Sequence, residues 1–299
     1  MELRDLRYFA TIAATGHISR AAQQLRITQP ALSKSVARLE HELGARLLER
    51  TPKGVSVTPV GQSVLRHAMR IRAATDDALR ECADVASGKA GHLRIGTGLA
   101  MAQFLVPAAC ARLLAVAPDV TIDIVAGTGR GLLPALRDGD LDVVLSGLPP
   151  RPEPGFAHEP IMEDDVVVIA RRRHPLHRRR ASTLAKLARE RWIVSRSDSL
   201  LSEWLQRKWQ DAGLTPPKPV VRTDSMSTLL SLVAATDLVT FHSWSTIRHS
   251  PMHDELRPLA NSAIAWRRRL GATYREGAFV SSAMRRLTEI LVELGARER

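Results

Sequence analysis

The sequence predicts an α/β protein in three parts: a small helical domain with a two-stranded wing, one long helix, and an α/β domain of two lobes. Three observations lead to this prediction. Short amphipathic helices joined by a tight turn fill the first 43 residues, a four-three apolar repeat follows, and from residue 92 short apolar strands alternate with helices. The expected boundaries are residues 1–58, 59–88 and 91–299.

Composition and charge limit the classes of protein to which the chain can belong. The chain has 299 residues, 44% hydrophobic and 25% charged, which suits about two domains with a sizeable core. The net charge of +12 favours a polyanionic partner. Residues 1–58 carry only +4 of it and residues 59–88 carry none, because much of the excess lies in arginine runs at 171–173, 178–180 and 267–269. The total charge therefore does not mark one nucleic-acid-binding face.

Other features exclude several classes. No apolar run approaches the ~18–20 residues of a membrane span, and the first residues lack the apolar core of a signal peptide. The two cysteines, Cys82 and Cys110, have neither disulfide-framework density nor metal-site spacing. We expect a cytoplasmic protein without membrane contact, disulfide, metal or cofactor.

The N-terminal segment predicts three helices. Leu6 and Phe9 recur at helical spacing, and Gly16 ends the first helix. Ser19 is the expected N-cap of the second helix, whose small inner residues permit close approach of a neighbour. A short turn then leads to Thr28, the expected N-cap of a third helix at residues 29–43. This arrangement predicts a helix-turn-helix, and residues 50–57 predict its wing.

The third helix has one apolar stripe and one polar face. On the polar face Gln29 and Ser33 can reach base edges in a major groove, and Pro30 can pack against a sugar or a thymine methyl group. Lys34, Arg38 and Lys53 of the wing can neutralise phosphates. An exposed polar face is often merely solvated, but the preceding helix, the turn and the basic wing favour binding to double-stranded DNA.

The long helix at residues 59–88 carries apolar and small residues at four-three spacing over three heptads. Thr58 and Pro59 supply its N-cap and first turn, and Gly88 is expected to end it. The pattern predicts dimerisation, and the alternative is an amphipathic helix packed on its own domain. The expected interface residues are Val64, Ala68, Ile71, Thr75, Ala78, Cys82 and Val85.

The α/β half predicts a ligand cleft, because ligands gather at the carboxyl ends of strands in open sheets. The segment GTGRGLL at 127–133 follows a strand and opens a helix, where an anion can bind. Its glycines miss the dinucleotide-binding register, so plain turn glycines and a small acidic ligand held partly by Thr128 remain open. Similar strand-end loops occur at 97–101, 146–147, 197–199, 224–227 and 241–242.

The sequence gives little indication of an enzyme, because it contains neither a G-x-S-x-G nucleophile elbow nor an H-E-x-x-H zinc motif. Asp164 and Asp165 would face opposite sides of a strand rather than share a proton. His174 and His177 lie in an arginine-rich segment and are expected to be solvated. That segment, Arg171 to Arg180, could touch DNA or an acidic partner, although a solvated basic surface is the simpler interpretation.

The first 61 residues resemble the DNA-binding part of LysR-type transcriptional regulators, and the order and length of the remainder match that family as well. Leu48 and Val57 replace a usual Phe and a usual Leu, and both still suit a core. The residues that carry the resemblance are Leu6, Phe9, Ala21, Ala22, Leu25, Gln29, Pro30, Leu32, Ser33, Leu39, Glu40, Leu43, Gly44, Leu47, Arg50, Thr58 and Gly61.

The resemblance implies a periplasmic-binding-protein-like effector domain, with one lobe at 91–162 plus 267–299 and the other at 163–266. Many members that bind carboxylates have a hydroxyl residue near Leu99, whereas here Thr97 stands two residues earlier. Either Thr97 and Thr128 share an acid group, or the ligand is recognised differently. The candidate effector-binding residues are Thr97, Leu99, Met101, Thr128, Ser146, Ser197, Met226 and Phe241.

The sequence thus predicts a regulator, not an enzyme, that binds a two-fold-related promoter site as a homodimer or homotetramer. A small-molecule effector, an organic or aromatic acid, would alter how the dimers are arranged, and RNA polymerase is an expected further partner. One alternative is an architectural protein without a ligand, which would discriminate DNA sequences weakly. Another is an α/β enzyme with a DNA-binding appendage, which turnover by residues 91–299 alone would reveal.

Overall fold

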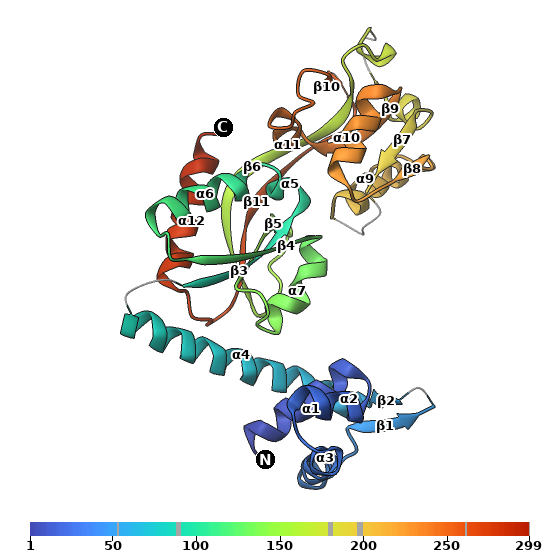
Figure 1. The fold of residues 1–299 in the computed structure, drawn as a ribbon. Coiled ribbons are helices and arrows are strands. Elements are labelled where there is room, and N and C mark those ends of the chain that lie inside the picture. Colours follow the sequence, from blue (N-terminus) through green and yellow to red (C-terminus); the bar gives the residue numbers. More distant parts are fainter. Residues whose placement is uncertain (53, 88–90, 179–181, 196–199, 261, 299) are drawn as a thin grey trace. The chain divides into compact units, whose positions relative to one another are not determined.

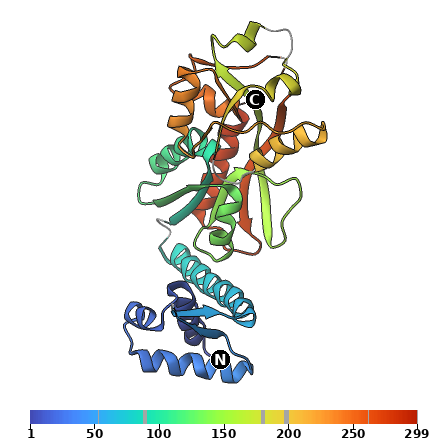
Figure 2. The same cartoon turned by 90° about the vertical axis from the view of Figure 1, so that its right-hand side faces the viewer.

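The computed structural model describes residues 1–52, 54–87, 91–178, 182–195, 200–260 and 262–298. The chain divides into two compact units, the first holding Met1–Ala83 and the second nearly all of the remainder. Figures 1 and 2 show the elements of each unit from two directions. Each unit is described by itself.

The N-terminal unit is a winged helix-turn-helix. Leu6, Phe9 and Leu39 are buried in one core cluster, and Ile12 and Leu32 in a second. The wing strands pair antiparallel, with Leu48 opposite Val57. Its elements are α1 (Leu3–Thr15), α2 (Ile18–Leu25), α3 (Gln29–Leu43), β1 (Leu48–Thr51) and β2 (Gly54–Val57).

Local signals fix the helix ends, and two of the three expected N-caps are present. The Thr28 side chain accepts a hydrogen bond from the backbone of Ala31, and that of Thr58 accepts one from Gly61. Gly16 ends α1 in the left-handed region at φ 67°, which favours glycine. The expected cap at Ser19 is wrong: the N-cap is His17, two residues earlier, and α2 begins at Ile18.

The long helix α4 spans Pro59–Ser87. Its first turn lies close to the N-terminal core, since a Cβ on Gly61 would lie 2.2 Å from the carbonyl oxygen of Leu47. Gly88, the expected end of the helix, lies outside the described residues.

The described part of the C-terminal unit is built on a nine-stranded sheet in the order β4-β3-β5-β11-β6-β9-β7-β8, with β10 beside β6. The strands are β3 (His92–Gly98), β4 (Thr121–Gly127), β5 (Val143–Gly147), β6 (Phe156–Arg171), β7 (Arg191–Val194), β8 (Val221–Arg222), β9 (Leu238–Ser243), β10 (Leu256–Pro258) and β11 (Ala265–Arg275). The helices are α5 (Leu99–Ala102), α6 (Leu105–Val116), α7 (Gly129–Arg137), η1 (Pro175–Arg178), α8 (Leu184–Leu187), α9 (Leu200–Asp211), α10 (Met226–Ala235), α11 (Trp244–Arg248) and α12 (Ser282–Ala296).

Two lobes share one antiparallel strand pair. Lobe one contains the parallel strands β3, β4 and β5, and lobe two the parallel strands β7, β8 and β9. The long strands β6 and β11 pair antiparallel along their length and connect the lobes. In lobe one α6 and α12 lie side by side (Figure 1) and bury Leu113 and Leu287 in a common core. The parallel winding was predicted; the long antiparallel pair was not.

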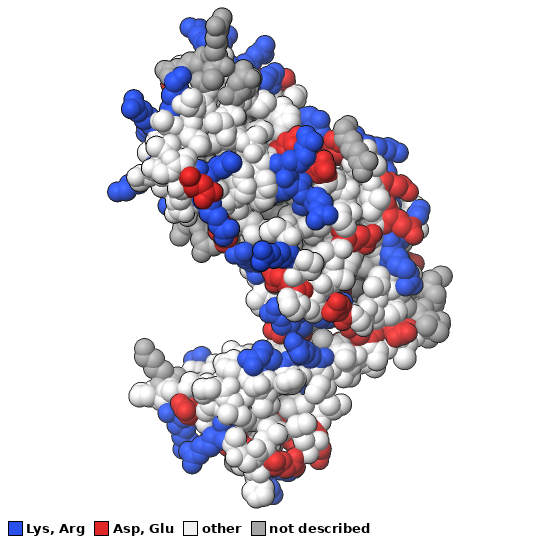
Figure 3. Space-filling view, turned by 180° about the vertical axis from the view of Figure 1, so that it is seen from behind, with Lys and Arg blue, Asp and Glu red and all other residues white. Residues whose placement is uncertain are grey.

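Charged residues of the C-terminal unit are partly internal. Asp164 is buried and Asp165 is exposed, as the strand alternation predicted. On the face seen in Figure 3, basic and acidic side chains are interspersed rather than gathered in one patch. The expectation that His174 is solvated is wrong: it is 2% exposed. Its Nδ1 accepts a hydrogen bond from the backbone of Leu176, and its Nε2 lies 3.3 Å from the carbonyl oxygen of Asp237.

Among the described residues no helix is both long enough and apolar enough to cross a bilayer. The same residues contain no cluster of His, Cys, Asp and Glu placed to hold a metal ion.

Candidate functional site

The first two turns of α3 present polar side chains to solvent. Leu32 and Val36 anchor the opposite side of the helix in the core. Four of the predicted DNA-binding residues therefore share one exposed surface, because the apolar stripe fixes the rotation of the helix. These are Gln29, Pro30, Ser33 and Lys34. Figure 2 shows α3 lengthwise at the outer edge of its domain.

Arg38, the fifth predicted residue on this helix, is held from inside the domain. The Asp5 carboxylate is buried and accepts hydrogen bonds from Ser35 Oγ at 2.5 Å and from Arg38 Nη2 at 2.5 Å. Burial alone would raise the pKa of Asp5, but these hydrogen bonds and the guanidinium charge hold it below its usual value. The Arg38 side chain keeps 43% of its surface exposed, so it flanks the α3 surface while anchored to α1.

The wing is formed by β1 and β2, with Arg50 exposed on β1. Lys53, predicted to reach DNA from the wing, lies outside the described residues.

The predicted dimer seam divides into two parts. Ala68 is 4% exposed in the core of its own domain, and Val64 and Ile71 pack against the same core. Thr75, Ala78 and Cys82 are exposed instead, as is Leu79 at 66%. The side chain of Val85 lies outside the described residues. The first half of the apolar stripe therefore packs on its own domain, which was the stated alternative to dimerisation.

A cleft opens between the two lobes of the C-terminal unit, which we name the interlobe cleft. It contains about 1220 Å³ of empty space, part of it open solvent. Leu99 and Thr128 line it from lobe one, Phe241 lines it from lobe two, and Arg268 from the shared strand β11. Five of the predicted effector-binding residues lie here: Leu99, Met101, Thr128, Ser146 and Phe241.

Three predicted residues are not among the described lining residues. Thr97 is fully buried and its hydroxyl donates to the carbonyl of Gly98. Met226 packs in a lobe-two core with Leu229 and Leu230. Ser197 lies outside the described residues.

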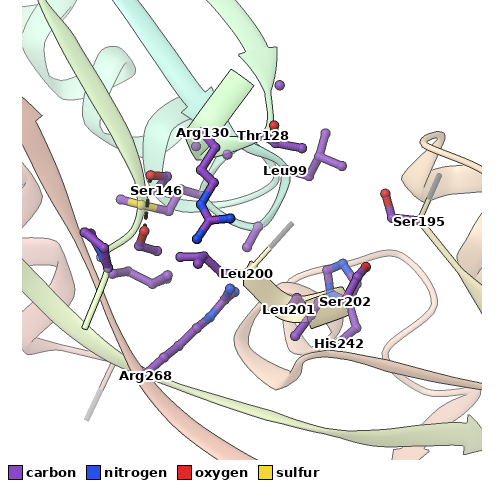
Figure 4. Close-up of a pocket in the computed structure, with 18 of the residues that line it drawn as sticks. Leu99, Thr128, Arg130, Ser146, Ser195, Leu200, Leu201, Ser202, His242 and Arg268 are labelled. Atoms are coloured by element: carbon purple, nitrogen blue, oxygen red, sulfur yellow. Dashed lines mark hydrogen bonds between the residues drawn. The ribbon is translucent and has the colours of Figure 1, made fainter. Parts of the chain in front are cut away.

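The main polar side chains of the cleft were not predicted from the sequence. Figure 4 shows Arg130 and Arg268 extending into the same space from different walls, with Ser195, Ser202 and His242 on the lobe-two side. Arg130 lies within the glycine-rich turn that the sequence marked for anions, so its charge was the available signal. Arg268 is the middle residue of the arginine run at 267–269, and no local sequence feature distinguished it from its two neighbours.

Buried hydrogen bonds fix the position of Arg268. Its Nε and Nη2 each lie 2.9 Å from Asp164 Oδ2, and Ser243 donates to Asp164 Oδ1 at 2.6 Å. Register supplies the pairing, because Arg268 on β11 lies opposite Asp164 on β6. The third guanidinium nitrogen, Nη1, points toward Gly147, where a Cβ would lie 3.3 Å away. Gly147 lines the cleft, so this nitrogen is placed for a ligand.

His242 is a neutral donor at the floor of the cleft. Burial and the nearby Arg268 charge lower the pKa of His242 to about 4. Its Nδ1 accepts a hydrogen bond from the backbone of Ser243 at 2.9 Å, which places the ring proton on Nε2. Beside it the rings of Trp204 and Phe241 are stacked at 5.3 Å, and Trp204 stacks in turn on Trp266 at 5.4 Å. Of these three rings Phe241 lines the cleft, which therefore offers apolar walls, one aromatic ring and a few fixed donors.

An exposed helix-turn-helix surface and a separate two-lobed ligand cleft define a DNA-binding regulator with a sensing domain. The profile of the "Bacterial regulatory helix-turn-helix protein, lysR family" matches residues 3–62, and that of the "LysR substrate binding domain" matches residues 86–296. The chain belongs to the LysR family of transcriptional regulators, and it is a DNA-binding transcription regulator with an effector-binding domain.

Individual relatives support this family assignment. The chain is 32% identical over 242 residues to the HTH-type transcriptional regulator GbpR of Azospirillum brasilense, covering 80% of this chain and 71% of the relative. It is 30% identical to the SDS degradation transcriptional activation protein of a Pseudomonas species, covering 99% and 97%. The fold matches full-length OxyR of Pseudomonas aeruginosa with a TM-score of 0.70 at 23% identity, covering 98% of each chain.

Proposed function

We propose that the protein binds a two-fold-related promoter site as a dimer or dimer of dimers and regulates RNA polymerase there. Gln29, Pro30 and Ser33 read bases, and Lys34 and Arg38, with Lys53 of the wing, contact the DNA backbone. The observation that carries the proposal is the exposed start of α3, where Thr28 caps the helix and Leu32 turns its polar face outward. A major groove accepts such a helix, and its first turns reach the base edges.

A quantitative titration of DNA against salt tests this assignment. Ser33→Ala removes a base contact and reduces discrimination between target and random DNA by up to ~1–3 kcal/mol. Lys34→Ala removes a phosphate contact, so it weakens binding to all sequences and reduces the salt slope by about 1. Lys218→Ala, an exposed lysine of the C-terminal unit, is the matched control and leaves both quantities unchanged. Wild-type specificity and salt slope in both α3 variants would contradict the assignment.

Two copies pair through the second half of α4 in this proposal. Thr75, Ala78, Leu79 and Cys82 supply the contact, because Val64, Ala68 and Ile71 are occupied by their own domain. Leu79→Glu should reduce the mass measured by light scattering, whereas Val64→Ala should lower stability without changing the oligomeric state. An unchanged mass for Leu79→Glu would exclude this half of the helix as the interface.

The effector in this proposal is an organic or aromatic acid bound in the interlobe cleft. The Phe241 ring in the cleft lining and the donors of Arg130, Arg268 and His242 support it. All five tryptophans lie between residues 192 and 266, so their fluorescence reports on this domain alone. A screen of organic acids, aromatic compounds and sugars by fluorescence and thermal shift should yield a stabilising ligand that alters DNA binding. A broad screen without any such ligand would refute the sensing role.

A further inference from the structure

An ion pair bridges the mouth of the interlobe cleft. Arg130 lies in the first turn of α7 in lobe one, and Glu203 in the first turn of α9 in lobe two. Their side chains meet at 2.5 Å between Arg130 Nη1 and Glu203 Oε1. Glu203 is 34% exposed, and its second basic neighbour, Arg207, is more distant at 3.8 Å. Arg130 also lines the cleft, so a carboxylate of the protein already occupies one of the ligand's candidate partners.

The surroundings of Arg130 are built for an anion. The nine-residue helix α7 begins here, with Thr128 Oγ1 accepting from the backbone of Gly131, and its N-terminal N–H groups favour negative charge. Ser146 is 7% exposed, and its Oγ lies 2.7 Å from where a Cβ on Gly129 would be. Among the described lining residues Arg130 and Arg268 are the basic pair, and Glu153 is the acid.

A second, independent feature points to a ligand in the same cleft. His242 is 8% exposed and lines the cleft. Its Nδ1 has a hydrogen-bond partner, whereas Nε2 has none among the described residues. An imidazole N–H that lines the cleft and has no protein partner among the described residues can donate a hydrogen bond to a ligand oxygen.

We infer that Glu203 is a built-in competitor for the effector: its carboxylate holds Arg130 while the cleft is empty, and a carboxylate of the effector takes its place. This inference rests on the proposed function of the cleft. A carboxylate is the group to expect, because it is the group that Arg130 holds in this structure. Since α7 and α9 belong to different lobes, the exchange removes an ionic connection between them and thereby couples ligand binding to the lobes' arrangement.

Titrations of the full-length protein with benzoate, salicylate and succinate, followed by tryptophan fluorescence, test the exchange. Glu203→Gln frees Arg130 and lowers the Kd of the carboxylates that bind by about fivefold, the scale of an exposed ion pair. Arg130→Gln removes the partner of the ligand and raises Kd by about tenfold or more. Glu289→Gln breaks the surface pair Arg286–Glu289 of the same domain and is the matched control, with an unchanged Kd. Phenyl phosphate in parallel reports whether a phosphate competes as well as a carboxylate.

The outcomes separate the inference from the function it rests on. Equal Kd values for wild type and Glu203→Gln overturn the exchange and leave the cleft as the effector site. Tighter binding by Glu203→Gln that Arg130→Gln abolishes supports the exchange. A lack of binding by all three carboxylates to Glu203→Gln also overturns it, because the freed Arg130 should hold them. The sensing role is then decided separately by the broad screen of wild type.

Discussion

The two units of the molecule each contain a buried aspartate held by a serine and an arginine. In the N-terminal unit Asp5 accepts from Ser35 and Arg38, and in the C-terminal unit Asp164 accepts from Ser243 and Arg268. The distances are similar, at 2.5 Å and 2.6 Å from the serine hydroxyls. The arginines differ: Arg38 is 43% exposed and Arg268 is 11% exposed.

The difference in arginine exposure shows that the same trio of aspartate, serine and arginine serves a different purpose in each unit. Asp5 ties α1 to α3 and leaves an arginine beside the DNA-binding surface, where water can solvate the charge if the pair breaks. Asp164 joins the long strands β6 and β11, and its arginine is enclosed between that pair and the cleft. Breaking a buried pair leaves an uncompensated charge, whereas breaking a half-exposed pair costs much less.

The largest expected effect is that of Asp164→Asn, which should destabilise the C-terminal unit by about 3–5 kcal/mol because Arg268 is left buried without its carboxylate. Urea unfolding followed by tryptophan fluorescence measures it. Asp165→Asn is the matched control on the adjacent residue, and it should cost less than about 1 kcal/mol because its pair with Arg267 is exposed. Equal losses in the two variants would abolish the distinction.

Next in size is a pH effect at His242, which lies beside the same Asp164–Arg268 pair. Because its pKa in the folded state is about 4 rather than 6.5, the unfolded state takes up the proton first as the pH falls. Stability should therefore decrease from about pH 6.5 toward pH 4, by about 3 kcal/mol in all. His242→Gln should flatten this part of the pH profile of tryptophan-detected unfolding. An identical slope in that variant would assign the effect to other groups.

A smaller effect is expected for Asp5→Asn, about 1–3 kcal/mol, from loss of the charge-assisted hydrogen bonds to Ser35 and Arg38. Hydrogen exchange of the α1 and α3 amides measures it locally. The folded pKa of Asp5 lies below its unfolded value of 3.8, so its contribution is complete above that pH and is lost as the pH falls further. Glu49→Gln, an exposed site on β1, is the control. A loss as large as that of Asp164→Asn would contradict the comparison.

Local chemistry explains what could be predicted from the sequence. Neighbouring residues determine the helices of the N-terminal unit, the wing, and the caps at Thr28 and Thr58. For these features the structure agrees with the prediction. The strand alternation also predicted that Asp164 and Asp165 face opposite sides, and Asp164 is the buried one. An apolar stripe, by contrast, does not specify which surface covers it, so the stripe of α4 was assigned to a partner copy although Ala68 packs on its own domain.

The candidate site depended on contacts distant in sequence. Arg130 meets Glu203 only when the two lobes come together, and Arg268 meets Asp164 only through the antiparallel pairing of β6 and β11. Neither pairing leaves a spacing that sequence inspection can detect. His174 was misjudged for the same reason: its arginine-rich neighbours suggested solvent, whereas its ring is buried and its Nε2 lies 3.3 Å from the carbonyl oxygen of the distant Asp237.

Whether α3 reads a DNA sequence is tested most directly by sequencing the DNA that the purified full-length protein selects from random duplexes. We expect a two-fold-related sequence for wild type, and for Ser33→Ala a looser preference at the base pairs that α3 contacts in each half. No enriched sequence for wild type, or the same sequence with the same preference for Ser33→Ala, would contradict this expectation.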